Sequence, residues 1–403
     1  MPRLPAALPS VRALAALATL SLGTLAAPLA APLAAQQVAV GGRSVACPTD
    51  SVRPIAAPRT PLPAAEATAG ITRFTFIAYG DTRGRHDGEQ LQAEHQLVME
   101  SMLATIKAAA SGPDPVRFVL QSGDAVLRGP AAAQWNVSYI PIVERLTTQA
   151  NLPYFLAVGN HDVTGTQNLA DPQRAIGMCH YFAANARLIP AEGAAHRLAG
   201  YPDYGFGYGN TFFLAFDSNV AGDSVQLAWV TRELEGLDRR RYPNVVAFFH
   251  HPAFSSGPHG GVRVEPQAAA LRELYMPLFR RHHVRLLLTG HEHLFEHWVE
   301  RYTDASGAHR MDQIVSGGGG APLYGYVGEP DLRDYLKAGA GAGVRVEHLV
   351  KPALDPGANP FHFVVVHVDG EQVRVEVVAA DWGRGFAPYR SAGAVLDDAP
   401  ASR

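Results

Sequence analysis

The residues of this chain best suited to chemistry are aspartates, histidines and one asparagine that directly follow short apolar runs. In chain order they are Asp81, Asp124, Asn160-His161-Asp162, His250-His251, and the pair His291 and His293. Carboxylate oxygens and imidazole nitrogens in this mixture suit Zn²⁺, Mn²⁺ or iron ions. Glycine directly precedes Asp81, Asp124, Asn160 and His291, and glycine lets a chain turn sharply and approach an ion closely. The pattern therefore predicts one metal site built from several loops.

Taken singly, these pieces also fit ordinary structural roles. A Gly-Asp pair is a common turn, and His250-His251 alone fits the surface end of a strand. Alternating histidines such as His291 and His293 do little for a turn and suit a metal. All the pieces in this order, each after an apolar run, favour a functional site over a set of unrelated turns.

Apolar runs of strand length must position these side chains. They cover residues 74–79, 118–121, 154–158, 211–216, 245–249, 284–289 and 313–315, and are rich in β-branched and aromatic residues. Helical patterns lie between them at 90–110, 131–148, 224–239 and 265–283. This alternation predicts an α/β fold. The candidate ligands then lie at the carboxyl ends of strands, where sites form in open α/β sheets.

The first residues have the pattern of an export signal. Arg3 and Arg12 lead into an Ala/Leu-rich run at 13–27, and no acidic residue occurs before Asp50. We therefore expect a signal peptide over residues 1–35 and a secreted or periplasmic protein without a membrane span in its mature form. An uncleaved membrane anchor is the alternative, although prolines interrupt the apolar run.

The rest of the chain divides by composition. We expect an Ala/Pro-rich linker at 36–70, a globular domain at 71–383 with a surface insertion at 325–360 and a terminal hairpin at 361–380, and a loose tail at 384–403. The hairpin is predicted because Asp369-Gly370 separates two apolar runs.

Composition narrows the class of protein. The chain has 403 residues, 47% hydrophobic, with a formal net charge of −3, which excludes disorder over most of its length. The balanced charge disfavours nucleic acid as a partner. Cys47 and Cys179 are not in a Cys-x-x-Cys metal motif. In an exported protein they could form a disulfide or stay free, because pairing does not follow from number alone.

The order Asp81, Gly123-Asp124, Gly159-Asn160-His161-Asp162, His250, Gly290-His291-x-His293 resembles the calcineurin-like metallophosphoesterase superfamily. The resemblance covers residues 71–324, with the terminal hairpin as an extension. It implies a four-layer α/β/β/α sandwich with a metal site at the carboxyl ends of the strands. It also implies a metallophosphoesterase, that is, a hydrolase of phosphoric esters.

The resemblance further implies a role for each matching residue. Asp124 would bridge two divalent or trivalent ions (Fe, Mn or Zn), with a hydroxide between the ions attacking phosphorus. Asn160, His250 and His291 would complete one ion site, and Asp81 and His293 the other. His161 would serve the leaving group, and Asp162 would orient the His161 ring.

Two positions depart from relatives of this kind. Purple acid phosphatases have a tyrosine ligand where this chain has Gly84, so no iron–tyrosinate colour is expected. Many other members have a histidine where this chain has Arg83. A guanidinium offers no lone pair to a cation. We therefore expect Arg83 to clamp a substrate phosphate, with the first metal either recruiting another ligand such as His86 or binding weakly.

The sequence thus predicts an exported phosphatase or small-substrate phosphodiesterase. Two alternatives are a catalytically weak protein of the same fold that binds metal and phosphate, and a nuclease or nucleotide pyrophosphatase. The sequence leaves open the substrate, the metal and the oligomeric state.

Overall fold

The computed structural model describes residues 37–41, 43–48, 50–380, 388–389 and 395–396. Its strands form two seven-stranded sheets and a small two-stranded one, β1 (Gln37–Val40) with β2 (Arg43–Ala46). The first large sheet has the order β15-β14-β13-β3-β4-β5, and β16 also pairs with β14. Its strands are β3 (Arg73–Tyr79), β4 (Val116–Gln121), β5 (Tyr154–Leu156), β13 (Phe361–Asp369), β14 (Gln372–Ala380), β15 (Pro388–Tyr389) and β16 (Val395–Leu396).

The second large sheet has the order β12-β10-β11-β9-β8-β7-β6. Its strands are β6 (Tyr204–Tyr208), β7 (Thr211–Ala215), β8 (Asn244–Phe248), β9 (Leu286–Thr289), β10 (Phe295–Asp304), β11 (Gly307–Ser316) and β12 (Arg345–Val350). Strands β7, β8, β9 and β11 run parallel to one another, as do β3, β4 and β5 in the first sheet.

An aromatic layer fills the space between the two sheets. Phe76 and Phe118 of the first sheet stack on each other and contact Phe213 of the second, with ring centroids 5.1–5.3 Å apart. Large rings bury much apolar area, and offset or edge-to-face packing adds about 0.5–1.5 kcal/mol per pair.

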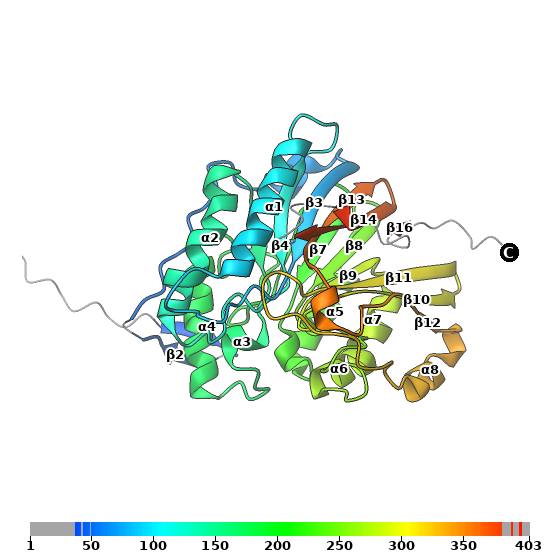
Figure 1. The fold of residues 1–403 in the computed structure, drawn as a ribbon. Coiled ribbons are helices and arrows are strands. Elements are labelled where there is room, and N and C mark those ends of the chain that lie inside the picture. Colours follow the sequence, from blue (N-terminus) through cyan, green and yellow to red (C-terminus); the bar gives the residue numbers. More distant parts are fainter. Residues whose placement is uncertain (1–36, 42, 49, 381–387, 390–394, 397–403) are drawn as a thin grey trace, which may run out of the picture. The chain divides into compact units, whose positions relative to one another are not determined.

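Helices cover the outer faces of both sheets (Figure 1). The first sheet is covered by α1 (Ala93–Ala109), α2 (Ile140–Glu144) with its flanking helical turns η2 (Gln134–Tyr139) and η3 (Arg145–Gln149), and α4 (Pro172–Asn185). The second is covered by α5 (Ser224–Glu235), α6 (Pro266–Ala270), η5 (Leu271–Tyr275) and α7 (Met276–Arg281). The predicted four-layer α/β/β/α sandwich is confirmed.

The sheet topology explains where the candidate ligands meet. Asp81 follows β3, Asp124 follows β4, and Asn160 opens α3 (Asn160–Val163) after β5. His250 follows β8, and His291 follows β9. In each sheet these strands run parallel, so their carboxyl ends reach one edge and deliver the ligands there.

Segments predicted as peripheral contribute to this framework. In the predicted linker, Val52 and Ile55 are buried in the core beneath the helices of the first sheet. In the predicted insertion, α8 (Arg333–Ala338) is followed by β12, which pairs with β10 and extends the second sheet. An edge strand or a short packed segment needs few apolar residues. The composition of these two segments therefore led to the prediction of a linker and a surface insertion.

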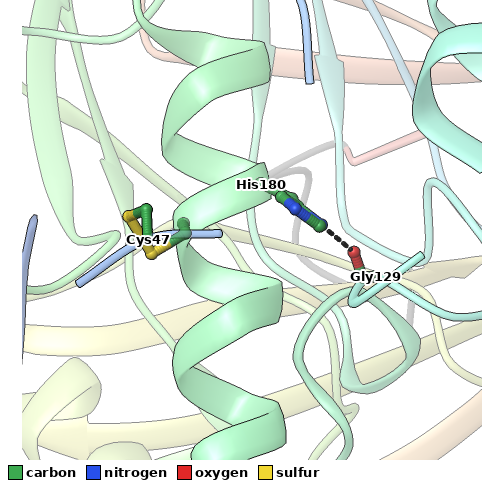
Figure 2. Close-up of a disulfide and its surroundings, with 4 residues drawn as sticks. Cys47, Gly129 and His180 are labelled. Atoms are coloured by element: carbon green, nitrogen blue, oxygen red, sulfur yellow. Dashed lines mark hydrogen bonds between the residues drawn. A yellow bond between two sulfur atoms is a disulfide. The ribbon is translucent and has the colours of Figure 1, made fainter. Parts of the chain in front are cut away.

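Cys47 and Cys179 form a disulfide with a Cα–Cα distance of 5.6 Å (Figure 2). It joins the segment after β2 to α4. The predicted signal peptide lies outside the described residues, and of the predicted loose tail only 388–389 and 395–396 are described. Among the helices described, none combines the length and apolar character needed to cross a bilayer.

Candidate metal centre

Three predicted ligands have an uncommon backbone conformation. The φ angles are +60° at Asp81, +53° at Asp124 and +70° at His291. Such left-handed geometry costs a non-glycine residue roughly 1–3 kcal/mol and persists where the surroundings fix it. Here the His291 N–H donates to both carboxylate oxygens of Asp81, at 3.0 and 2.9 Å. The strain marks these turns as a candidate functional site.

Glycine lets the loops approach one another. A Cβ on Gly159 would lie 2.3 Å from Asp124 Oδ1, and a Cβ on Gly123 would lie 2.8 Å from His250 Nδ1. Both distances are too short for a real side chain. The glycines before Asp124 and Asn160 therefore allow the ligand-bearing turns to touch.

One group of potential donors consists of Asp81, Asp124 and His293, whose ligand atoms all lie within 4.8 Å of one another. His293 donates from Nδ1 to the Pro322 carbonyl at 2.7 Å. Its Nε2 therefore carries a lone pair, which lies 3.6 Å from Asp81 Oδ1. This is the tautomer that a metal-binding imidazole needs.

A second group consists of Asn160, His250 and His291. His250 donates from Nδ1 to the Ser122 carbonyl at 3.0 Å. The lone pair on its Nε2 faces Asn160 Oδ1 at 2.7 Å, His291 Nδ1 at 3.2 Å and Asp124 Oδ1 at 3.3 Å. Asp124 thus lies next to both groups.

Four of the candidate ligands are buried, and burial shifts the pKa of three of them. The side chains of Asp81, Asp124, His250 and His293 are at most 2% exposed. Burial lowers the pKa of His250 and of His293 to about 3, so both rings are neutral at physiological pH. Burial and then the charge of Asp124 raise the pKa of Asp81 well above its ordinary value.

Asp124 behaves differently from Asp81. Burial opposes its ionisation, but the electrostatic interactions of its carboxylate with His250, His161 and Arg83 outweigh burial and hold the pKa of Asp124 below its usual range. The centre therefore keeps an ionised carboxylate beside neutral imidazoles.

These residues fit bound metal ions. The neutral His250 ring carries one N–H proton, and its Nδ1 uses that proton in the hydrogen bond to the Ser122 carbonyl. Its Nε2 therefore presents a lone pair to the Asn160 side-chain oxygen, which is also an acceptor. A cation that accepts those lone pairs would resolve the contact. Carboxylate, amide and imidazole donors of this kind suit Mn²⁺, Zn²⁺ or iron.

Arg83 lies at the edge of the first group. Its Nε is 3.6 Å from Asp124 Oδ2, and its Nη2 is 3.5 Å from His293 Nε2. The Nε atom is buried and makes no hydrogen bond within the described part of the chain. The guanidinium thus lies beside the candidate ligands with one N–H donor unused. His86, the other candidate on this loop, is exposed.

His161 and Asp162 differ from the sequence-based expectation in one respect. The His161 ring donates from Nδ1 to the Leu127 carbonyl at 2.8 Å, and its Nε2 lies 3.9 Å from Asp124 Oδ2. Asp162 does not orient this ring. Its oxygens accept from the backbone N–H groups of Ala125 and Gly159, at 2.9 and 2.8 Å. The side chains of adjacent residues in a helical turn point in different directions, so Asp162 does not face the His161 ring. Its carboxylate instead stabilises the backbone of the loops that carry Ala125 and Gly159.

Glu265 was missed by the sequence analysis. It lies just before α6 and accepts from His291 Nε2 and His259 Nδ1, each at 2.9 Å. Because His291 donates from Nε2, its Nδ1 lone pair faces His250 and Asn160. No local motif marks this glutamate, since its partner His291 is 26 residues away.

Two further residues of these loops, His251 and Glu292, are buried and hydrogen-bonded within the described part of the chain. His251 is buried and shares a hydrogen bond with Ser218 Oγ at 2.9 Å, which supports its strand-end role. Glu292 is buried and accepts from the N–H groups of His259 and Gly260. Burial raises the pKa of Glu292 to about 7.

The glycines at 317–320 allow close packing. A Cβ on Gly317 would lie 2.1 Å from the Glu292 carbonyl, and the N–H of Gly319 donates to the Gly80 carbonyl at 2.9 Å. This turn therefore supports the loop that carries Asp81.

Helix α4 and the loop at 127–129 support His161 from behind. His180 donates from Nδ1 to the Gly129 carbonyl at 2.8 Å (Figure 2), and the Gly129 N–H donates to the His161 carbonyl at 2.8 Å. Cys179, next to His180, carries the disulfide.

Comparisons with known proteins agree with this geometry. A family model described as "Calcineurin-like phosphoesterase" matches residues 80–295, the segment from before Asp81 to beyond His293. A search of curated proteins found no match.

One solved structure shares the fold, and other solved structures are similar to the chain. A purple acid phosphatase, PPD1, from yellow lupin (Lupinus luteus) seeds superposes with a TM-score of 0.55 at 18% identity, covering 82% of this chain and 55% of that one. GAP50 of Plasmodium gives a TM-score of 0.46 at 14% identity, covering 79% and 89%. PhoD gives 0.48 at 12% identity, covering 82% and 73%. The chain thus spans little more than half of the lupin protein's length.

Proposed function

Because the chain belongs to the calcineurin-like phosphoesterase family, we propose that it hydrolyses small phosphoric esters, as a phosphatase or a small-substrate phosphodiesterase, after export from the cytoplasm. Metal-dependent phosphoester hydrolysis is the chemistry of that family. The observation that carries the proposal is the contact between His250 Nε2 and Asn160 Oδ1 at 2.7 Å, two acceptors that a metal ion would join. Ions held there would supply positive charge for phosphate oxygens and acidify water.

In this proposal, the six ligands are Asp81, Asp124, Asn160, His250, His291 and His293. The family implies two ions at such a site, with Asp124 between them. The division of the described residues next to Asp124 into two groups supports this arrangement. The identity of the metals is a matter for elemental analysis.

Arg83 would hold the substrate. A guanidinium offers parallel N–H donors that match two oxygens of a phosphate group. The Nε of Arg83 is buried, has no hydrogen-bond partner among the described residues, and lies 3.6 Å from Asp124 Oδ2. The positive charge of the guanidinium is therefore close to the proposed ligands. It would neutralise phosphate charge together with the metal ions.

His161 would assist the leaving group. The Leu127 carbonyl fixes the ring through Nδ1, so Nε2 is the atom available to donate a proton to the departing oxygen. The 3.9 Å distance between Nε2 and Asp124 Oδ2 supports this role.

One observation favours a second candidate function. Arg83 beside Asp124 and His293 repels a cation in the first group, so a protein that binds one ion and phosphate but turns over slowly is the alternative. Purified protein should be tested against chromogenic phosphate monoesters and diesters, with elemental analysis of the same sample. Metal-dependent turnover supports the enzyme. Metal and phosphate binding without turnover supports the alternative.

The proposed export rests on features outside the candidate metal centre. The basic and apolar start of the chain and the disulfide between Cys47 and Cys179 support it, because disulfides persist in oxidising compartments. Mass spectrometry of the native protein tests it, and a chain that begins near residue 36 is the expected result.

A further inference from the structure

A cavity of about 730 Å³ lies at the opposite end of the second sheet from the metal ligands. Asn244 and Arg285, which line it, stand where β8 and β9 begin. His250 and His291 follow the other ends of these strands. A strand of this length spans about 15 Å, so the cavity and the metal centre are separate.

Arginines dominate the lining. Arg239, Arg285, Arg301, Arg310 and Arg345 all line the cavity, and among its described lining residues Glu371 is the single carboxylate. Carboxylates behind the wall offset part of this charge. Asp312 contacts both Arg285 and Arg310, at 3.2 and 2.7 Å, and Glu347 lies 3.3 Å from Arg301. Asp312 thus contacts two of the guanidinium groups that line the cavity.

The register of the sheet places three of these arginines in a row. Arg301 on β10 pairs directly with Arg310 on β11 and with Arg345 on β12. Residues that oppose each other in antiparallel strands share a face, and like charges there are destabilising. Neighbouring strands are about 4.8 Å apart, so the row of cations is about 10 Å long. An anion lying along the row would relieve that repulsion.

Arg239 adds a partly satisfied cation. Its Nη2 donates to the carbonyls of Pro243 and His283, at 2.9 and 3.3 Å. Its Nη1 is buried and has no hydrogen-bond partner among the described residues. A buried guanidinium that meets only carbonyl oxygens gains from an anionic acceptor.

Two histidines also line the cavity. His283 and His309 stack with ring centroids 4.0 Å apart, and both contact Asp304, at 2.6 and 2.9 Å. Asp304 pairs with both imidazoles and is not itself among the residues that line the cavity.

We propose that this cavity binds a small polyanion carrying several phosphate or sulfate groups spaced by about 5 Å, the distance between neighbouring strands. The arginine row sets the spacing, and Arg239 and Arg285 contact the anion from the adjoining loops. This site is independent of phosphoester hydrolysis at the metal centre, so either can fail without the other.

Calorimetric titration of the full chain tests the proposal with two probes, sucrose octasulfate and inorganic tripolyphosphate. We expect saturable binding of at least one probe by the wild type. Arg345→Glu should weaken it by about tenfold or more, as the loss of charged hydrogen bonds does. Binding of the sulfated probe alone identifies sulfate groups on a sugar-sized frame, and binding of tripolyphosphate alone identifies a phosphate chain.

Matched variants distinguish binding in the cavity from general attraction of anions to surface charge. Arg187→Glu makes the same charge change at an exposed position outside the cavity, and we expect binding within about twofold of the wild type, since distant exposed charges are screened. Arg345→Glu should fold normally and keep phosphoesterase turnover, because it places opposite charges on β10 and β12.

Three results would overturn the proposal. The wild type binds neither probe saturably, or Arg345→Glu and Arg187→Glu weaken binding equally, or binding is lost in Asn160→Ala and kept in Arg345→Glu. The last result would assign the anion to the metal centre.

Discussion

Asn160 and His161 are adjacent in sequence and have different expected roles. The Asn160 oxygen lies between His250 and His291, whereas the His161 ring is held by a backbone carbonyl. We expect Asn160→Ala to lose metal and turnover together. His161→Ala should keep its metal and lose about 10²–10⁴-fold in kcat, as acid–base groups do.

Elemental analysis and steady-state kinetics on the same samples measure both effects. His86→Ala, an exposed histidine of a neighbouring loop, is the control and should match the wild type. Equal metal loss in Asn160→Ala and His161→Ala would show that the two roles are assigned wrongly.

Arg83 lies at the edge of the Asp81–Asp124–His293 group. If its guanidinium binds phosphate, Arg83→Ala should raise KM for phosphate esters, since a bidentate charged contact contributes roughly 1.5–3 kcal/mol. Arg83→His should tighten metal binding in the Asp81–Asp124–His293 group while also raising KM. Stepwise metal titration with kinetics measures this. Unchanged KM and kcat in Arg83→Ala would remove Arg83 from the substrate site.

Glu265 should act on the metal through His291. Glu265→Gln cannot accept from His291 and His259 with a full charge, so the His291 Nδ1 lone pair is less firmly directed at the site. We expect metal affinity to fall by about 10–100-fold, as for other carboxylates behind metal-bound histidines. Competition with a chelator of known affinity measures this without relying on activity.

Glu273→Gln, an exposed glutamate in η5 of the same helical stretch, is the matched control. Equal metal affinity in Glu265→Gln and wild type would reduce Glu265 to a loop brace.

Single residues also show how far sequence reasoning reaches. The six candidate ligands were predicted because they lie in turns that follow apolar runs, and the structure brings their side chains together. The contacts of Glu265 and Asp162 were not found. Glu265 meets its partners through the tertiary fold, and Asp162 accepts from backbone N–H groups, which carry no sequence signal.

Among the elements, α4 connects the disulfide to the site. Cys179 lies on α4, and the next residue, His180, holds the loop behind His161. The disulfide closes a sequence separation of 132 residues, and such a cross-link restricts mainly the unfolded chain. We expect the double variant Cys47→Ala, Cys179→Ala to lose about 2–5 kcal/mol of unfolding free energy, with kcat close to that of the wild type.

Urea denaturation and kinetics measure these two effects. Thiol titration of the denatured, unreduced wild type should find no free thiols. Two free thiols would contradict the disulfide, and a large fall in kcat without a loss of stability would show that α4 controls the site directly.

Strand prediction succeeded where strands are apolar and failed where they carry charge. The runs that became β3, β4, β8 and β9 were found within a few residues. Strand β10 was not found, because Glu296 and Glu300 are buried in it. Ser256 and Arg280 satisfy those carboxylates from distant loops and helices, at 2.8 Å each, and the sequence does not show such partners.

On the scale of the whole molecule, the net charge of −3 conceals a strong local asymmetry. Carboxylates and neutral imidazoles gather at the carboxyl edge of the parallel strands, and arginines line the cavity at the other end of the second sheet. Composition predicts neither cluster, because each arises from strand order and register. The parallel strand order is what turns separate Asp and His turns into one centre.

The central claim is that this centre hydrolyses phosphate esters only with bound metal. The most direct measurement is turnover of a chromogenic phosphate ester as Mn²⁺ or Zn²⁺ is returned to the chelator-treated chain, with bound metal measured in the same samples. We predict that turnover rises with bound metal to a plateau in the wild type, and that folded Asp124→Ala shows neither binding nor turnover. Full turnover by wild-type protein shown to be free of metal, or by Asp124→Ala, would contradict the account.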